Sequence, residues 1–365
     1  MDDKLKIARE RINEIDRKMA DLFCERMEAV ELVAAHKKEH GLPVLDAARE
    51  DAVVQQNLQF VKDPEMQEYY VKFLRDTMKL SRRYQQRLLQ GMRIAYSGVE
   101  GAFAHIAANR IFPDAEKLAC GDFQEAYDEV VSGRCDAAVL PIENSYAGEV
   151  GQVMDLMFSG SLYINGVFEL AITQNLLGLP GAAIGDIRTV ISHSQALSQC
   201  APYISQKGFE QISYVNTALA AQRVQELGDI HTAAIASEET AELYGLTVLE
   251  RNINSSRSNT TKFAVFSRAE AGGGRNPSGK HFIIVFTARN EPGSLAKCID
   301  IIGRHGFNMR ALRSRPMKAL LWQYYFYVEA EGDIHSTEGK IMLEELSAHC
   351  DRLKMIGTFN LHEEL

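Results

Sequence analysis

The sequence predicts a multidomain protein in which an all-α segment is followed by an α/β segment and then by a small α+β segment. Three observations predict this order. Residues 3–38 contain neither glycine nor proline, and their apolar side chains recur with the three-four spacing of a long amphipathic helix. From Arg93, short apolar runs alternate with stretches of helical period, as in α/β proteins. Residues 281–365 read as strand, helix, strand, strand, helix and strand, which is typical of a ferredoxin-like sandwich.

The composition is that of an ordinary folded protein. The chain has 365 residues, which is enough for two or three domains. Of these residues, 46% are hydrophobic and 24% are charged. Its net charge of −9 argues against a general nucleic-acid binder. The sequence has a charged start, and it contains no apolar run of about 18 residues. We therefore expect no membrane span, no secretion signal and a cytoplasmic location. The six cysteines lie far apart without a CxxC pair, so we expect reduced thiols and no zinc site.

Helix-breaking residues divide the first 91 residues into three helices. Gly41 ends the first, a second fits residues 46–60, and Asp63-Pro64 opens a third that runs to about Gln90. The first helix is about 50 Å long at 1.5 Å per residue. Three such helices enclose little core, so we expect pairing with a second copy of the chain.

Charged and polar side chains interrupt the apolar faces of these helices. Arg26 lies on the apolar seam of the first helix, and Lys37, eleven residues later, shares its face. Arg9 is rotated from that face by roughly 100°, so we expect it to serve a partner chain. In the third helix, Ser81 and Gln85 form an i, i+4 pair within an apolar stripe. Because buried cations need an anionic partner, we interpret the set as the wall of a polar cavity.

Local pairing is the alternative interpretation of these residues. Asp46 would cap the second helix, with Glu50 near the capping-box position. Arg26 would pair with Asp16 or Glu25. Taken together, however, these residues suit one particular kind of ligand. They provide three cations, an amide, a hydroxyl and one carboxylate, which match a small dicarboxylate that carries an ether oxygen and a hydroxyl.

Residues 1–91 resemble the all-helical chorismate mutase family. Its members carry an Arg early in the first helix, ER in its middle and a Lys near its end, followed by D-x-x-RE and S-x-x-x-Q. This sequence supplies the same set in the same order: Arg9, Arg26, Lys37, Asp46, Arg49, Glu50, Ser81 and Gln85. The resemblance implies an intertwined homodimer in which Arg9 reaches into the partner's site.

The resemblance also implies a role for each side chain. Arg9 and Arg26 would hold carboxylates, Lys37 and Gln85 would hydrogen-bond the ether oxygen of chorismate, and Glu50 would bind its hydroxyl. Chorismate then rearranges to prephenate through a pericyclic transition state, in which an ammonium group stabilises the negative charge on the ether oxygen. The remaining substrate-binding residues implied by the family are Asp46, Arg49 and Ser81.

Polar motifs follow the predicted strands of the α/β segment. They are the G-x-x-G loop at 98–101, PIENS at 141–145, SHSQAL at 192–197 and NTTKF at 259–263. Each is also compatible with a turn or a helix cap. A glycine-rich, polar stretch at 269–280 marks a flexible linker after this segment.

Residues 92–268 resemble prephenate dehydratases, whose motifs are a G-x-x-G loop, PIENS or PIENT, SHPQAL and TRF. The resemblance implies two α/β lobes with a cleft between them, as in periplasmic binding proteins, and places Asn144, Ser145, Gln195 and Thr261 in that cleft. Thr261 would be the essential hydroxyl when prephenate loses carbon dioxide and its ring hydroxyl to give phenylpyruvate. Lys262 stands where the family has Arg, so a single ammonium group replaces a guanidinium that can donate two parallel hydrogen bonds. We include Lys262 among the substrate-binding residues.

Residues 281–365 resemble the ACT domain that binds phenylalanine in this family. The family's GALV reads Gly293-Ser294-Leu295-Ala296 here, and its ESRP begins with Arg313 in place of Glu. The candidate effector-binding residues are Gly293, Ser294, Leu295, Ala296, Ser314 and Arg315. A purely structural dimerisation domain is the alternative.

The three resemblances together predict a chorismate mutase–prephenate dehydratase of phenylalanine synthesis, inhibited by phenylalanine and dependent on no metal or organic cofactor. We expect a homodimer or a higher homo-oligomer. One rival is an arogenate dehydratase, whose substrate carries an amine in place of the side-chain keto group. Another is a regulator that senses a metabolite without converting it.

Overall fold

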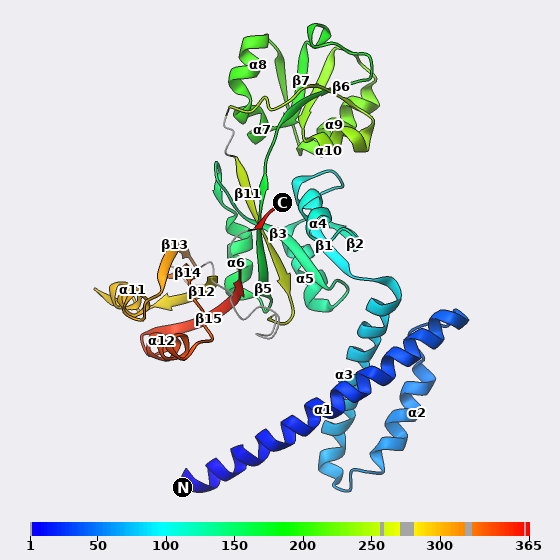
Figure 1. Ribbon diagram of the computed structural model, residues 1–365, viewed down its shortest axis with the longest axis vertical. Helices are drawn as coiled ribbons and strands as arrows, with labels where there is room; N and C mark the ends of the chain where they lie inside the picture. Colours follow the sequence, from blue (N-terminus) through cyan, green and yellow to red (C-terminus); the bar gives the residue numbers. More distant parts are fainter. Residues whose placement is uncertain (1, 256–258, 271–280, 318–322, 361–362) are drawn as a thin grey trace. The chain divides into compact units, whose positions relative to one another are not determined.

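The computed structural model describes residues 2–255, 259–270, 281–317, 323–360 and 363–365 (Figure 1). The chain divides into two compact units, Met1–Met92 and Arg93–Leu365. Of the expected linker, residues 271–280 lie outside the described residues. Within the described ranges, no helix is long and apolar enough to cross a membrane.

The first unit consists of the three predicted helices, α1 (Asp2–His40), α2 (Ala47–Leu58) and α3 (Pro64–Gln90). α1 ends where Gly41 adopts a left-handed φ of 62°, which glycine reaches without a Cβ clash. Asp63 caps α3 by accepting a hydrogen bond from the N–H of Glu65 at 3.0 Å, and Pro64 begins the helix.

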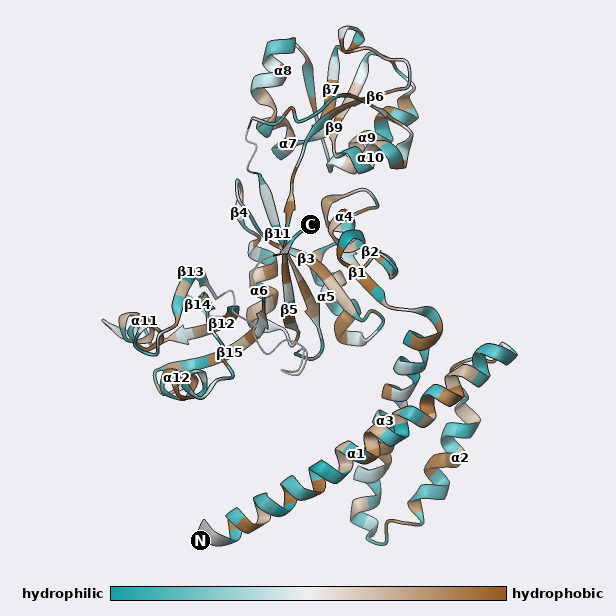
Figure 2. Cartoon of the chain, in the orientation of Figure 1, coloured by the Kyte–Doolittle hydropathy of each residue, from teal (hydrophilic) through white to brown (hydrophobic). Residues whose placement is uncertain are grey.

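This helical unit buries little apolar surface of its own. Its buried apolar residues are Val30, Ala34, Val54 and Met78. Large apolar side chains are instead spaced along the whole of α1 (Figure 2), and nine of them are between 42% and 74% exposed. They are Leu5, Ile7, Ile12, Ile15, Met19, Leu22, Phe23, Leu32 and Val33. An exposed apolar surface of this extent is typical of an interaction site.

The second unit begins with an α/β lobe whose sheet has the order β5-β11-β3-β1-β2. β1, β2 and β3 run parallel, whereas β11 is antiparallel to both of its neighbours. The elements of this first lobe are β1 (Arg93–Ser97), α4 (Phe103–Ile111), β2 (Glu116–Cys120), α5 (Phe123–Ser132), β3 (Ala137–Asn144), β4 (Gly148–Glu149), α6 (Gly151–Ser159), β5 (Tyr163–Ala171) and β11 (Thr260–Ser267).

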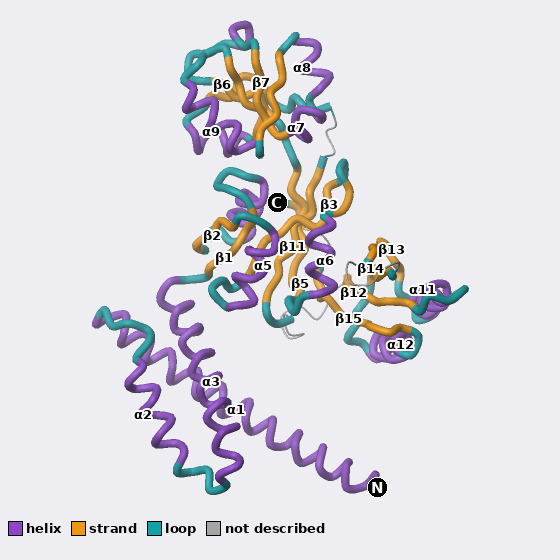
Figure 3. The backbone as a smooth tube through the Cα atoms, turned by 180° about the vertical axis from the view of Figure 1, so that it is seen from behind, coloured by secondary structure: helices purple, strands orange, loops and turns teal. Residues whose placement is uncertain are grey.

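The chain enters a second lobe after β5 and returns to the first at β11. The sheet of the second lobe has the order β10-β6-β9-β7-β8, and helices cover both of its faces (Figure 3). Its elements are β6 (Asn175–Gly178), a 3-10 turn (Ile184–Asp186), β7 (Thr189–His193), α7 (Ser194–Gln199), α8 (Ala201–Lys207), β8 (Glu210–Tyr214), α9 (Thr217–Leu227), β9 (Thr232–Ala236), α10 (Glu238–Tyr244) and β10 (Thr247–Glu250). The middle segment thus has the two lobes that its motifs implied.

The C-terminal segment shows the expected order of strands and helices. Its elements are β12 (His281–Ala288), α11 (Ser294–Arg304), β13 (Asn308–Pro316), β14 (Tyr324–Glu331), α12 (Thr337–Ser347), β15 (Cys350–Phe359) and a last short strand, β16 (Glu363–Glu364). The four longer strands form an antiparallel sheet in the order β13-β14-β12-β15.

This C-terminal sheet is continuous with the sheet of the first lobe. β15 pairs with β5 where Gly357 lies opposite Ile164, and a Cβ on Gly357 would lie 1.9 Å from the Ile164 carbonyl oxygen. Phe158 of α6 stacks on Tyr325 of β14 with 4.4 Å between the ring centroids. One apolar core therefore extends from the first lobe into the C-terminal segment.

Candidate active sites

Polar residues of the helical unit meet between α1 and α3. Nη1 of Arg26 donates a hydrogen bond to Oγ of Ser81, which donates to the carbonyl of Thr77 at 2.9 Å. Arg26 is half-buried, and this burial lowers the pKa of its guanidinium. One turn further along α3, Gln85 is buried, and its Oε1 has no hydrogen-bond partner among the described residues. A buried acceptor without a donor is costly, so this cluster offers a free acceptor next to a cation.

The last turn of α1 contributes an ammonium group. Nζ of the half-buried Lys37 donates to the carbonyl of Val44 at 2.5 Å. Two residues later, Asp46 caps α2 by accepting a hydrogen bond from the N–H of Arg49 at 2.9 Å. The local interpretation of Asp46 as a helix cap is therefore confirmed.

Glu50 is held by a residue that the sequence analysis did not single out. Its carboxylate forms an ion pair with Arg82 of α3, and the two side chains are 22% and 27% exposed. The sequence signal for Arg82 is its place inside the S-x-x-x-Q motif, directly after Ser81. In the described part of the chain, no ion pair joins Arg26 to Asp16 or Glu25. The seam cation meets a hydroxyl of α3 instead of a neighbouring acid.

Two candidate residues of the helical unit stay outside this cluster. Arg9 and Arg49 are exposed, and neither side chain makes a hydrogen bond or ion pair to any other described residue. Arg9 precedes Arg26 by 17 residues, which is about 25 Å along a helix. It therefore cannot reach the Arg26 side chain within one chain.

A cavity of about 530 Å³ lies between the two lobes of the second unit. It is lined by residues that follow the carboxyl ends of β1, β2 and β3 in one lobe and of β7 and β8 in the other. Ligands of α/β proteins bind at such strand ends. Asn144, Gln195 and Thr261 line it, together with Gly98, whose φ of 101° turns the loop after β1. We call it the cleft cavity.

The cleft cavity receives positive potential from helices instead of from basic side chains. Its described lining includes residues at the N-termini of α4, α5, α6 and α9, but neither lysine nor arginine. The N–H groups at a helix N-terminus favour an anion. The same lining also contains two carboxylates, Asp122 and Glu149, of which Asp122 accepts a hydrogen bond from the N–H of Glu125 at 2.8 Å. The helix N-termini can therefore bind a small anion when Glu149 is also paired.

The Asn144 amide donates a hydrogen bond to the Thr261 hydroxyl. Oδ1 of Asn144 accepts hydrogen bonds from the N–H groups of Tyr146 and Ala147 at 3.0 and 2.9 Å, which establishes which end of the amide carries hydrogen. Nδ2 then donates to Oγ1 of Thr261 at 2.9 Å. Among the described residues, no group accepts a hydrogen bond from the buried Thr261 hydroxyl, so its proton is available to donate to a ligand.

Two residues expected in the cleft lie elsewhere. Oγ of Ser145 accepts from the N–H of Thr260 at 2.9 Å, so it joins β3 to β11, and Ser145 is not among the described residues that line the cavity. Lys262 follows Thr261 on β11 and points to the opposite face of the strand. Its Nζ lies 3.5 Å from Oε2 of Glu143, outside the cavity lining.

His193 lines the cleft cavity although the sequence analysis did not select it. Its Nδ1 accepts a hydrogen bond from the N–H of Gln195 at 3.3 Å, so the neutral ring carries its proton on Nε2. The signal was present, because this histidine belongs to the SHSQAL motif.

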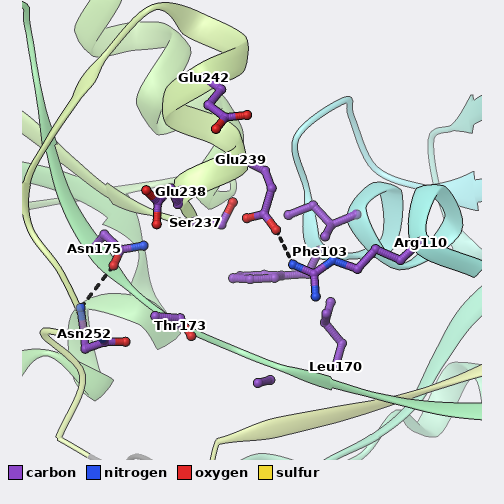
Figure 4. Close-up of a pocket in the computed structure, with 12 residues that line it drawn as sticks. Phe103, Arg110, Leu170, Thr173, Asn175, Ser237, Glu238, Glu239, Glu242 and Asn252 are labelled. Atoms are coloured by element: carbon purple, nitrogen blue, oxygen red, sulfur yellow. Dashed lines mark hydrogen bonds and ion pairs between the residues drawn. The ribbon is translucent and has the colours of Figure 1, made fainter. Parts of the chain in front are cut away.

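A second cavity between the lobes, of about 420 Å³, has the opposite character (Figure 4). Glu238, Glu239 and Glu242 of α10 line it, and Arg110 of α4 forms an ion pair with Glu239. Asn252 donates its N–H to Oδ1 of Asn175 at 3.0 Å across the same space. Glu238 also forms an ion pair with Arg251, so two of the three carboxylates are paired.

The C-terminal segment has a smaller cavity of about 220 Å³, lined by residues that include Thr287, Leu295, Tyr324 and Phe326. Of the six candidate effector residues, Leu295 alone belongs to this described lining. Gly293, with a φ of 84°, precedes the first residue of α11, Ser294, and Ala296 is exposed on the same helix. Ser314 and Arg315 are neighbours on β13 and point to opposite faces, with Ser314 exposed.

An α/β unit with a polar cleft at its strand ends, joined to a helical unit with its own cationic cluster, defines an enzyme with two separate sites for small anions. A model of type II chorismate mutases matches residues 8–86, and a model of prephenate dehydratases matches residues 94–271. The bifunctional chorismate mutase/prephenate dehydratase of Enterobacter agglomerans is 31% identical over 98% of this chain and 96% of its own.

Two further relatives cover about three quarters of the chain. Arogenate dehydratase/prephenate dehydratase 1 of Arabidopsis thaliana is 33% identical over 73% of this chain and 72% of its own. The crystal structure of the prephenate dehydratase of Arthrobacter aurescens in complex with L-Phe is 26% identical, with a TM-score of 0.68, over 74% of this chain and 90% of its own. The chain belongs to the bifunctional chorismate mutase/prephenate dehydratase family. It is an enzyme that converts chorismate to prephenate and prephenate to phenylpyruvate.

Proposed function

We propose that residues 1–91 hold the mutase site and that the cleft cavity within residues 92–268 is the dehydratase site. The observation that carries the second assignment is the Thr261 hydroxyl, which accepts a hydrogen bond from Asn144 and lies in the wall of a cavity that is bordered by helix N-termini. Prephenate is a dianion with a ring hydroxyl to lose, so it needs both features. None of the described residues that line the acidic cavity of Figure 4 belongs to the PIENS, SHSQAL or NTTKF motifs.

In the mutase reaction, the Arg26 guanidinium binds a carboxylate of chorismate, and the Lys37 ammonium and the amide N–H of Gln85 donate hydrogen bonds to its ether oxygen. The transition state breaks the C–O bond and builds negative charge on this oxygen, which a prepositioned ammonium stabilises. Glu50, held by Arg82, accepts the hydroxyl proton of the substrate in a hydrogen bond. Asp46, Arg49 and Ser81 support this set, and Arg9 enters from the partner subunit.

The intertwined homodimer is supported by two features of the helical unit. The apolar side chains exposed along α1 need a covering surface, and a second copy of the same helix provides one of matching length and pattern. Arg9 lies about 25 Å from the cluster of its own chain, so a partner's Arg9 is needed to complete each site.

In the dehydratase reaction, electrons of the bond to the departing carboxylate move into the ring, which becomes aromatic as hydroxide leaves. The Thr261 hydroxyl donates a hydrogen bond to the departing oxygen, and a proton taken up there gives water. The helix N-termini hold the carboxylate that remains, while the closed cleft removes water from the one that is lost. Gln195 lies across the cavity and contacts the substrate from the second lobe.

The C-terminal residues 281–365 form an ACT domain that binds phenylalanine and inhibits the dehydratase, and residues 269–280 link it to the preceding domain. The order β13-β14-β12-β15 and the cavity at Leu295 support this proposal. The Arthrobacter relative carries L-Phe in its structure, as its description states. Gly293, Ser294, Ala296 and Ser314 complete the proposed effector set, whereas the expected Arg315 pairs with Glu149 and Asp155 of the first lobe.

Arogenate is a second candidate substrate of the dehydratase site, because the Arabidopsis relative is described as an arogenate dehydratase as well. The two substrates differ by an amine in place of a keto group. Comparing their turnover by the purified protein separates them, and a higher kcat/KM with arogenate would replace prephenate as the substrate proposed here.

One assay tests both sites at once. Purified protein is mixed with chorismate, and prephenate and phenylpyruvate are followed separately. We expect prephenate to rise first and phenylpyruvate to follow. A protein that consumes chorismate without forming phenylpyruvate, or that binds prephenate without turnover, would contradict the proposal and favour a metabolite sensor.

A further inference from the structure

Two departures from the family motifs, Lys262 and Arg313, meet at one carboxylate. Nζ of Lys262 lies 3.5 Å from Glu143 Oε2, and Nη2 of Arg313 forms an ion pair with Oε1 of the same residue. Lys262 comes from β11 of the first lobe, whereas Arg313 comes from β13 of the C-terminal segment. The charge reversal at Arg313 therefore has a partner in the dehydratase lobe.

Glu143 and a second carboxylate, Glu149, face each other across the short hairpin of β3 and β4. Their Cα atoms are direct partners in the register, and like charges placed directly opposite on neighbouring strands destabilise the pairing. Asn144, the next residue of β3, pairs with Gly148 in the same hairpin. Repulsion between the two carboxylates would thus open the hairpin that carries Asn144.

Two guanidinium groups of β13 bind this pair of carboxylates. Nε of Arg313 lies 3.6 Å from Oε2 of Glu149, so Arg313 contacts both acids. Nη1 of Arg315 lies 2.7 Å from Oε1 of Glu149, and its Nε lies 3.3 Å from Oδ1 of Asp155 on α6. We call the six residues Glu143, Glu149, Asp155, Lys262, Arg313 and Arg315 the ionic cluster. Three carboxylates meet three cations there.

The ionic cluster is largely enclosed by protein. The side chains of Arg313 and Arg315 are each 21% exposed, and the Arg313 guanidinium carbon lies 5.4 Å from the centroid of the Tyr327 ring. Arg315 packs so tightly against Gly151 that a Cβ there would lie 2.6 Å from its terminal nitrogens. Hydrogen bonds to Glu149 and Asp155 outweigh the opposing effect of burial and raise the pKa of Arg315, so it stays charged.

Glu149 is also part of the wall of the cleft cavity. An unpaired carboxylate at this position would repel a dianionic substrate, because the cavity contains no lysine or arginine among its described lining residues. The partners of Glu149 thus influence both the shape of the site, through Asn144, and its charge.

We propose that Arg313 and Arg315 of the C-terminal segment are positioning residues of the dehydratase. They neutralise Glu143 and Glu149, which keeps the hairpin that carries Asn144 in place and prevents the two carboxylates from repelling a dianionic substrate in the cleft cavity. The inference rests on the assignment of the cleft cavity as the prephenate site. It gives the C-terminal segment an indirect part in catalysis, through the hairpin of Asn144, in addition to any effector that it binds.

The test uses the full-length protein with four variants. Arg313→Gln removes the positive charge, and Arg313→Lys keeps a positive charge but lacks the bidentate guanidinium. The double variant Arg313→Gln with Glu149→Gln removes the positive charge and one of the carboxylates that it contacts. Arg310→Gln is the matched control, because Arg310 lies on the same strand and pairs with Glu331 of its own segment. Dehydratase kcat and KM for prephenate are measured for each, with mutase activity as an internal standard.

We expect Arg313→Gln to lose at least tenfold in dehydratase kcat/KM, mainly through a raised KM, while mutase activity stays within twofold. Arg313→Lys and the double variant should regain most of the loss, and Arg310→Gln should match the wild type. If Arg313→Gln fails to fold, the double variant must still fold and turn over prephenate.

Equal activity of Arg313→Gln and Arg310→Gln would overturn the proposal, as would a double variant no better than the single one. A wild-type protein without prephenate turnover would instead refute the assigned function. The two failures are therefore distinguishable.

Discussion

The hydroxyl of Thr261 provides the sharpest test of the dehydratase site. Thr261→Val keeps the shape of the side chain and removes the one group that we assign to hydroxide departure. The Asn144 amide loses an acceptor but keeps the Thr260 carbonyl at 3.1 Å and Oδ1 of Asn259 at 2.9 Å. The fold should therefore lose about 1 kcal/mol of stability at most.

The catalytic loss should be far larger than this structural one. Removing one preorganised donor to a developing oxyanion typically costs about 10² to 10³ in kcat, or about 2.7 to 4 kcal/mol. The assay supplies chorismate and measures prephenate and phenylpyruvate by separation at fixed times. Thr261→Val should convert chorismate to prephenate at the wild-type rate and then accumulate it.

Thr260→Val is the matched control, because Thr260 precedes Thr261 on β11 and is not among the described residues that line the cleft cavity. We expect its phenylpyruvate formation to stay within about threefold of the wild type, as for surface substitutions. Phenylpyruvate formation by Thr261→Val within tenfold of the wild type would refute the role of the hydroxyl. Equal loss of both activities would refute the separation of the two sites.

Three further predictions concern the rest of the chain. Lys37→Ala and Arg9→Ala should each lower the mutase rate by about 10² or more without affecting the dehydratase. When the two variants are mixed in equal amounts and exchange subunits, half of the dimers contain one intact site, so the mixture should regain about a quarter of the wild-type mutase activity. No regain would exclude a site shared between subunits. Titrating phenylalanine into the dehydratase assay should inhibit phenylpyruvate formation, and a flat response at millimolar concentration would remove phenylalanine as the effector. Gly357→Ala should lower the thermal midpoint by several degrees, measured by calorimetry, because its Cβ would meet the Ile164 carbonyl at 1.9 Å; an unchanged midpoint would contradict the pairing of β15 with β5.

Much of the fold could be predicted from local sequence. α3 was expected from Asp63-Pro64 to about Gln90 and spans Pro64–Gln90, because capping and the φ restriction of proline are local effects. The SHSQAL motif was expected to follow a strand, and β7 (Thr189–His193) ends within its first two residues. The continuity of β15 with β5 was not predicted, because strand pairing over such a distance in sequence depends on tertiary packing.

The candidate site was predicted less evenly. Asn144 and Thr261 meet as their motifs implied, but Ser145, Lys262 and Arg315 point away from the expected ligands. The reason is physical, because neighbours on a strand face opposite sides and a motif names residues without their faces. Arg82 was missed since its partner, Glu50, lies on another helix.

A crystal structure of Thr261→Val with prephenate bound would test the central claim most directly. The account predicts the substrate in the cleft cavity, with its carboxylates at the helix N-termini and its ring hydroxyl facing residue 261. Prephenate bound in the acidic cavity beside Glu239, or against Lys262 on the outer face of β11, would contradict it.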